Sequence, residues 1–358
     1  MLKKTVSRLQ PYTPETPLPE LEKRLGLASV VRLSANENPF GTSPKVKQAL
    51  QSWDFSNSRY YPDGDASALR QAVAAYLNVA PERLLFGNGL DEVIELISRT
   101  FLENGDEVLE LGPTFSEYKL HAQIENTNIR DVAVQTDGVA DLTALAAAIT
   151  AKTKLIWLCN PNNPTGTAVT RTAIAQFMAQ VPRTVLVLID EAYIDFVDDV
   201  AAYTAVPLLS EYDNLMVLRT FSKAYGLANF RVGYAVMPPK LAPSLQAVRL
   251  PYNLSAIAQL AAQTALADQV FLQTTVVRVQ KARQQWESFL QQQQFTFYQS
   301  QANFTFFQAP NALELAAYLL HHGFIVRTGL RPDWLRITFG TNEQNDKLQQ
   351  LILAFYQQ

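Results

Sequence analysis

The sequence has 358 residues, of which 48% are hydrophobic and 18% charged, and its formal net charge is −3. A chain of this length can bury a sizeable core and usually forms more than one domain. Its charge balance lacks the basic excess of a dedicated nucleic-acid-binding protein, so a polynucleotide partner is not expected.

Cysteine and histidine are too rare to predict a metal site or a disulfide. Cys159 is the only cysteine, and the chain has three histidines. The first twenty residues include basic side chains but no apolar segment after them, and no run of about 18 apolar residues occurs anywhere. We therefore expect a cytoplasmic protein that binds no metal and does not enter a membrane.

The N-terminal segment predicts an extended arm. Residues 10–19 read QPYTPETPLP and contain four prolines, which prevent regular hydrogen-bonded structure. Tyr12 within this segment is either an aromatic anchor that packs the arm down or a contributor to a binding site. A polar turn at residues 36–41 follows, and the next helices are expected over residues 44–50 and 66–77, on either side of the Tyr61-Pro62 turn.

Apolar segments that predict β-strands follow, and each ends at a polar loop. They cover residues 84–86, 107–111, 154–159, 185–189 and 215–218. Helical stretches alternate with them, which indicates an α/β domain with a largely parallel sheet. Loops at the carboxyl ends of parallel strands meet at one crevice, so we expect the polar clusters to form a single ligand site there.

The last third of the chain predicts a second, smaller α+β domain. A long helical region spans about residues 255–294 and is followed by alternating strands and helices. The expected division is an N-terminal arm, a large ligand-binding domain and a small C-terminal domain, at residues 1–35, 36–250 and 251–358.

Side chains at the ends of the later strands have the chemistry of a site for pyridoxal 5'-phosphate. Asp190 ends a strand that should be buried, so it requires a cationic partner such as a protonated pyridine nitrogen. The phenol of Tyr193 could hydrogen-bond a ring hydroxyl, and Ser222 and Arg231 could hold a phosphate. Lys223 lies among small and hydroxyl residues, where enclosure lowers the pKa of an amine and makes it nucleophilic towards an aldehyde.

Over nearly its whole length the sequence resembles the fold-type I, pyridoxal-phosphate-dependent aminotransferases of the aspartate aminotransferase superfamily. The resemblance rests on motifs in the family's order: Asn163-Pro164-Thr165-Gly166, Asp190-x-x-Tyr193, Ser222-Lys223 and Arg231-x-Gly233. Further motifs resemble the branch that acts on histidinol phosphate: Asn36-Glu37-Asn38-Pro39, Tyr61-Pro62, Asp190-Glu191-Ala192-Tyr193, Pro251-Tyr252-Asn253 and Leu335-Arg336-Ile337-Thr338. The implied fold is a mostly parallel sheet sandwiched by helices, plus a smaller α+β domain.

The resemblance also implies roles around the cofactor ring. Lys223 would bond the cofactor covalently and later move a proton between substrate and cofactor. Asp190 would hold the charged ring nitrogen, and Asn163 and Tyr193 would bind the ring oxygen. Phe115 would stack on the ring.

For the cofactor's phosphate, the resemblance implies a set of donors: the amides of Leu90 and Asp91, the side chains of Ser222 and Arg231, and Tyr61 from the other subunit of a homodimer. Arg336 would bind the carboxylate of glutamate or 2-oxoglutarate. Tyr12, Asn36 and Arg327 would help to hold the phosphate end of the substrate, L-histidinol phosphate.

Three other functions remain open from the sequence. An aminotransferase for aromatic or a broad range of amino acids would keep the same cofactor site. A pyridoxal-phosphate-dependent phosphothreonine decarboxylase would have a similar architecture but would release carbon dioxide. A pyridoxal-phosphate-sensing regulatory domain would require a DNA-binding module, and no helix-turn-helix pattern precedes Asn36.

Overall fold

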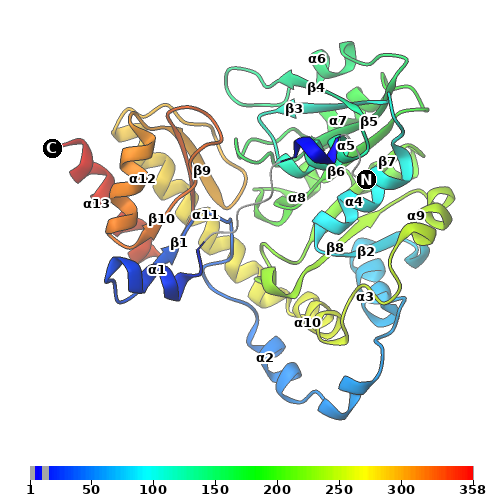
Figure 1. Cartoon of the computed structure of the whole chain (residues 1–358), viewed down its shortest axis with the longest axis horizontal. Coiled ribbons are helices and arrows are strands. Elements are labelled where there is room, and N and C mark those ends of the chain that lie inside the picture. Colours follow the sequence, from blue (N-terminus) through cyan, green and yellow to red (C-terminus); the bar gives the residue numbers. More distant parts are fainter. Residues whose placement is uncertain (1–4, 10–15, 358) are drawn as a thin grey trace.

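The computed structural model describes residues 5–9 and 16–357, so Tyr12 lies outside the described part of the chain. Figure 1 shows a larger lobe built around a β-sheet and a smaller lobe formed mainly by the C-terminal part of the chain. The long helix α11 (Gln269–Gln292) extends from the smaller lobe towards the larger one. Within the described ranges no helix is long and apolar enough to cross a membrane.

The larger lobe contains a seven-stranded sheet with the order β2-β8-β7-β6-β5-β3-β4. Its strands are β2 (Leu84–Asn88), β3 (Glu107–Gly112), β4 (Asn128–Ala133), β5 (Thr153–Cys159), β6 (Leu186–Asp190), β7 (Leu215–Thr220) and β8 (Val232–Val236). The pairs from β7 through β6, β5 and β3 to β4 are parallel, whereas β8 runs antiparallel to both β2 and β7. The prediction of a mostly parallel α/β sheet is therefore confirmed.

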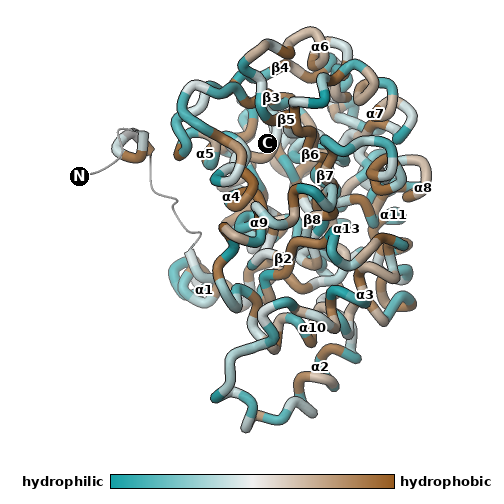
Figure 2. The backbone as a smooth tube through the Cα atoms, turned by 90° about the vertical axis from the view of Figure 1, so that its right-hand side faces the viewer, coloured by the Kyte–Doolittle hydropathy of each residue, from teal (hydrophilic) through white to brown (hydrophobic). Residues whose placement is uncertain are grey.

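Every residue of β6 and of β7 is buried, as expected for strands that are covered on both faces. Helix α4 (Leu90–Phe101) packs against β2, β7 and β8 and buries Val93, Ile94 and Ile97 on one face. Figure 2 shows the same distribution, with hydrophobic residues along the central strands and hydrophilic ones at the outer turns. The core therefore holds the carboxyl ends of the central strands in fixed positions.

Further helices surround the sheet. In the larger lobe they are α2 (Pro44–Gln51), α3 (Ser67–Leu77), α5 (Ser116–Ile124), α6 (Leu142–Ala147), α7 (Arg171–Met178), α8 (Val200–Tyr203), α9 (Ala242–Val248) and α10 (Ala256–Ala267). Helix α10 packs against α2 and α3, so the chain beyond residue 250 still contacts the larger lobe before α11 leaves it. The domain boundary near residue 250 stays a prediction.

The smaller lobe contains α11, α12 (Ala312–His321), α13 (Asn342–Tyr356) and the antiparallel pair β9 (Phe304–Gln308) and β11 (Trp334–Thr338). The N-terminal helix α1 (Leu18–Leu25) is followed by β1 (Val31–Arg32), which pairs in parallel with β10 (Phe324–Ile325). The region expected to be an arm is thus attached to the smaller lobe by a pair of strands. This pairing brings the polar turn after β1 beside the C-terminal part of the chain.

Two strands of the large sheet were not predicted from the sequence. β4 lies at the sheet edge and has mostly exposed or half-buried residues, so it lacks the continuous apolar run of its neighbours. β8 contains Gly233, and glycine weakens a strand pattern. The sequence prediction treated that segment only as the motif Arg231-x-Gly233, which follows Ser222-Lys223, and not as a strand.

Two carboxyl groups stand opposite each other at the edge of this sheet. Glu110 of β3 is in register with Asp131 of β4, and only 4% of Glu110 is exposed. Burial first, and then the neighbouring Asp131, raises the pKa of Glu110 from its usual 4.5 to about 8. Between these two values the folded protein keeps a proton that the unfolded chain has lost. Raising the pH across this window should therefore destabilise the fold by about 1.4 kcal/mol per pH unit through this group.

Glu110→Gln should remove this contribution, because glutamine is neutral at every pH. We expect the free energy of unfolding of the variant to fall less steeply between pH 5 and pH 8 than that of the unchanged protein, measured by urea denaturation. Glu107→Gln, in the same strand, is the matched control and should keep the steeper fall. Parallel profiles for the unchanged protein and Glu110→Gln would contradict the expectation.

Candidate active site

The polar loops after the central strands converge, as expected from the strand order. Asp190 ends β6, Lys223 follows β7, and the loop after β5 carries Asn160, Asn162 and Asn163. Because β5, β6 and β7 are adjacent and parallel, their carboxyl ends meet at one edge of the sheet. Residues from the N-terminal turn and from β11 complete the site from the smaller lobe.

Asp190 is buried, with both carboxylate oxygens hydrogen-bonded. Tyr118 donates from its hydroxyl to Oδ2 at 2.5 Å, and the amide of Ala192 donates to Oδ1 at 3.0 Å. Burial raises the pKa of Asp190 to about 6, and these two hydrogen bonds act in the opposite direction. A carboxylate can accept about four hydrogen bonds, so Asp190 keeps acceptor capacity for a cationic N–H group.

Lys223 is half-buried, and its amine donates to the carbonyl oxygen of Ala35 at 3.1 Å. Burial first, and then the positive charge of Arg336, lowers the pKa of Lys223 to about 8. The amine lies 5.6 Å from the centre of the Tyr193 ring. A partly buried lysine with a lowered pKa is suited to nucleophilic attack and to proton transfer.

The N-terminus of α4 forms an anion cradle beside this lysine. Gly89 precedes the helix with a φ of +82°, and no side chain among the described residues caps it. A Cβ atom at Gly89 would collide with the guanidinium of Arg231, and one at Gly233 would lie 2.7 Å from the Leu90 nitrogen. The glycines thus let Arg231 approach the first amides of α4, where the helix dipole favours a negative group.

Arg231 also pairs with Asp91 at 3.0 Å. Ser222, which precedes the lysine, is buried. The amides of Leu90 and Asp91, the Ser222 hydroxyl and the Arg231 guanidinium are therefore a donor set that fits a phosphate group. With the acceptor Asp190 and the amine Lys223, this set of side chains matches the functional groups of pyridoxal 5'-phosphate.

A buried network joins the N-terminal turn to both lobes. Asn36 donates from Nδ2 to the Tyr193 hydroxyl at 3.0 Å, and Thr338 of β11 donates to the Asn36 Oδ1 at 3.0 Å. Asn303, which precedes β9, donates to the Asn36 carbonyl at 3.1 Å. Asn36 is 1% exposed, so the structure places it against Tyr193.

Arg336 of β11 is buried and lies beside the loop after β5. It donates to the Asn163 Oδ1 at 2.5 Å and to the carbonyl oxygen of Ser34. Arg336 is also the strongest charged neighbour that lowers the pKa of Lys223. The structure therefore brings Arg336, Asn163 and Lys223 into one positively charged region, where an anionic substrate group could bind.

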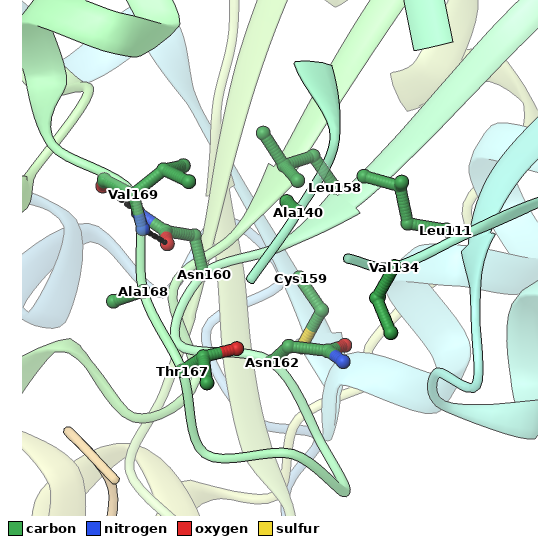
Figure 3. A pocket seen from close by; sticks show the side chains of 10 residues that line it. All are labelled: Leu111, Val134, Ala140, Leu158, Cys159, Asn160, Asn162, Thr167, Ala168 and Val169. Atoms are coloured by element: carbon green, nitrogen blue, oxygen red, sulfur yellow. Dashed lines mark hydrogen bonds between the residues drawn. The ribbon is translucent and has the colours of Figure 1, made fainter. Parts of the chain in front are cut away.

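A small pocket adjoins this region, between β3, β5 and the loop after β5. Figure 3 shows its lining, in which Asn160, Asn162 and Thr167 provide the polar groups and aliphatic side chains most of the rest. Asn162 accepts from Thr114 and donates to the Pro113 carbonyl, and these contacts tie the loop to the segment that carries Phe115. Phe115 is half-buried and meets Tyr118 edge to face at 5.6 Å.

Two predicted site residues are exposed in the single chain. Tyr61 is 81% exposed and stacks on Tyr252, with ring centroids 4.8 Å apart. Arg327 is exposed, although its backbone pairs with that of Arg336. Tyr12 falls outside the described residues.

Sequence reasoning did not identify Tyr118, Thr338 or Asn303 as parts of the site. Tyr118 had a detectable signal, because it follows Phe115 by three residues, within one turn of helix α5. Thr338 had a signal too, because it ends the motif Leu335-Arg336-Ile337-Thr338. Asn303 had none, because its contact with Asn36 joins positions that are far apart in the sequence.

Comparison with known proteins gives consistent results. The family model "Aminotransferase class I and II" matches residues 28–352. A histidinol-phosphate aminotransferase of Lactiplantibacillus plantarum is 52% identical and one of Limosilactobacillus fermentum 48% identical, over 99% and 100% of this chain and 99% of each relative.

A solved structure is similar over the whole chain. It is described as histidinol-phosphate aminotransferase from Sinorhizobium meliloti in complex with pyridoxal-5'-phosphate, and it has a TM-score of 0.89 with 27% identity. The match covers 99% of this chain and 98% of that one.

Proposed function

Since the chain belongs to the class I and II aminotransferases, we propose that its crevice transfers the amino group of L-histidinol phosphate to 2-oxoglutarate. The products would be imidazole acetol phosphate and glutamate, and the cofactor is pyridoxal 5'-phosphate. The observation that carries the proposal is the placement of Lys223, Asp190 and the anion cradle around one crevice. The full-length identity to relatives named for this activity supports the choice of substrate.

When bound, pyridoxal phosphate supplies an aldehyde that condenses with amines and a ring that accepts the electron pair of a broken Cα–H bond. Asp190 would hold the ring nitrogen, and Asn163 and Tyr193 the ring oxygen. Phe115 would cover a ring face. The amides of Leu90 and Asp91, with Ser222 and Arg231, would hold the phosphate at the cradle described above.

Lys223 would act as the base and acid of the reaction. With its pKa lowered to about 8, its amine is partly neutral near neutral pH and can take up a proton. Because Lys223 is only partly exposed, its amine would return that proton to the reacting molecule more readily than to solvent. The same side chain would thus serve both halves of the reaction.

Arg336 would bind the carboxylate of glutamate or 2-oxoglutarate, because a guanidinium can bind a carboxylate through two parallel hydrogen bonds. Tyr12, Asn36 and Arg327 would contribute to the phosphate end of histidinol phosphate. For Asn36 this contribution would be made through the backbone turn or through Tyr193, since its side chain is already hydrogen-bonded.

We further propose a cytoplasmic homodimer in which Tyr61 reaches the cofactor phosphate of the partner subunit. The exposed aromatic segment before α3 supports this, because Phe55, Tyr60 and Tyr61 are 76%, 61% and 81% exposed in the single chain. Sedimentation should give the mass of two 40.0 kDa chains, and the mass of one chain would rule the homodimer out.

The proposed function predicts that histidinol phosphate changes the visible absorbance of the cofactor-loaded protein without any second substrate. Because one site serves both half-reactions in turn, initial rates should give parallel lines in double-reciprocal plots. We would titrate with histidinol phosphate, glutamate and phenylalanine in parallel. Histidinol phosphate should act at far lower concentration than phenylalanine, and intersecting lines would contradict the alternating scheme.

The same titration, together with an assay for carbon dioxide release from phosphothreonine, separates the alternative functions. An equal or stronger response to phenylalanine would indicate an aromatic or broad-specificity aminotransferase. Release of carbon dioxide from phosphothreonine would indicate the decarboxylase. A protein that shows no cofactor absorbance after addition of pyridoxal phosphate would contradict all three enzymatic functions.

A further inference from the structure

We propose that Tyr118 is a positioning residue that sets the basicity of Asp190 and thereby keeps the cofactor's ring nitrogen protonated. The inference rests on the proposed role of Asp190 as the partner of that nitrogen. Tyr118 would act through Asp190 and would touch neither substrate nor the reacting atoms. Its hydroxyl would be required for rate more than for substrate binding.

The hydroxyl of Tyr118 is held in place by its ring. Tyr118 is fully buried and stacks on Trp157 of β5, with ring centroids 4.4 Å apart and an interplanar angle of 5°. Helix α5, which contains Tyr118, holds the backbone of this residue in place. The hydroxyl therefore points at Asp190 Oδ2, 2.5 Å away, and its other neighbour is the Cys159 thiol.

Tyr118 can act only as a donor in this contact. Burial, and then the charge of Asp190, raises the pKa of the Tyr118 phenol well above 10. The phenol therefore stays protonated at any working pH. A hydroxyl that donates to a carboxylate stabilises its ionised form, and this effect opposes the burial that raises the pKa of Asp190 to about 6.

Several other titratable groups face Asp190 from the surrounding elements: Cys159 of β5, Glu191 and Tyr193 after β6, and Asp91 of α4. The acidic ones are paired, since Glu191 meets Arg219 at 2.8 Å and Asp91 meets Arg231 at 3.0 Å. Burial raises the pKa of the Cys159 thiol and of the Tyr193 phenol, so both stay neutral. In the described part of the chain, Tyr118 is the side chain that donates to Asp190.

The consequence concerns where the proton between Asp190 and a ring nitrogen resides. A carboxylate that already accepts hydrogen bonds from Tyr118 and Ala192 is a weaker base. The proton then stays on the nitrogen, and the positive ring withdraws electrons more strongly. Without the hydroxyl, Asp190 would become more basic and would draw the proton towards itself.

The test compares Tyr118→Phe with the unchanged protein. Phenylalanine keeps the stack on Trp157 and removes one oxygen atom. We expect kcat to fall about tenfold with little change in KM, and the acid limb of the kcat profile to move to higher pH. With ¹⁵N-labelled pyridoxal phosphate bound, the ring-nitrogen NMR signal should move towards the unprotonated position.

Two controls make the outcomes separable. Tyr212→Phe removes another tyrosine hydroxyl of the larger lobe, one that donates to the Ala175 carbonyl, and should leave kcat and the nitrogen signal unchanged. Asp190→Asn should move the nitrogen signal further than Tyr118→Phe does. If Asp190→Asn has no effect on that signal, the proposed role of Asp190 fails. If it moves the signal and Tyr118→Phe does not, or if Tyr118→Phe changes only the melting temperature, the inference about Tyr118 is overturned.

Discussion

Lys223→Ala is expected to lower kcat by about four orders of magnitude, because the variant lacks the group proposed to carry the proton in both half-reactions. Within the described residues the Lys223 amine donates one hydrogen bond, to the Ala35 carbonyl, and its burial costs solvation of the charge. Its removal should therefore leave the fold intact. The anion cradle at α4 is unchanged in the variant, so pyridoxal phosphate should still bind, although without its covalent link.

The measurement is a single-turnover assay with histidinol phosphate, together with the visible spectrum and the melting temperature of the variant. Lys240→Ala is the matched control, because Lys240 is a surface lysine that pairs with Asp213 far from the crevice. The control should keep full activity. Repeated turnover by Lys223→Ala without added amine would show that another residue moves the proton.

Arg336→Gln is expected to have the second-largest effect, a loss of about 100-fold in kcat/KM for glutamate. A hydrogen bond to a charged group contributes about 1.5–3 kcal/mol, and a guanidinium makes two to a carboxylate. Because Arg336 lies beside Asn163 and away from the α4 cradle, the affinity for pyridoxal phosphate should change much less. The measurement is the glutamate half-reaction by stopped-flow absorbance, with cofactor affinity determined separately.

Arg336→Gln should also change the pKa of Lys223. Arg336 is the main charged neighbour that lowers the pKa of Lys223, so its loss should raise that pKa above about 8 in the cofactor-free protein. Arg336→Lys is the matched control, because it keeps the positive charge but loses the planar guanidinium with its two parallel donors. It should therefore preserve the pKa of Lys223 and recover little of the glutamate activity. Equal glutamate activity in the unchanged protein, Arg336→Gln and Arg336→Lys would assign carboxylate binding to another residue.

Local patterns were sufficient to predict the central strands. The apolar runs that became β5, β6 and β7 are continuous because these strands are buried on both faces, so composition alone marks them. The edge strand β4 and the glycine-containing β8 lack that pattern. Only pairing with their neighbours makes them strands, and pairing cannot be read from a short window.

The cofactor residues were predicted for a similar reason. Asp190, Lys223 and Arg231 lie in short motifs at or after the ends of strands, where the backbone must turn and the chemistry requires particular residues. The long-range contacts were not predictable. Tyr118 meets Asp190 across 72 positions of sequence, and Asn36 meets Tyr193 across 157.

By itself, then, the sequence determined the sheet's buried strands and the type of cofactor, and it offered the residues proposed to bind that cofactor, because each depends on neighbours along the chain. Only the tertiary structure decided that Tyr118 supports Asp190, that β1 joins β10 and that α10 packs on the larger lobe. Those arrangements depend on which surfaces meet when the chain collapses, and many pairs of apolar faces are compatible with the same local patterns.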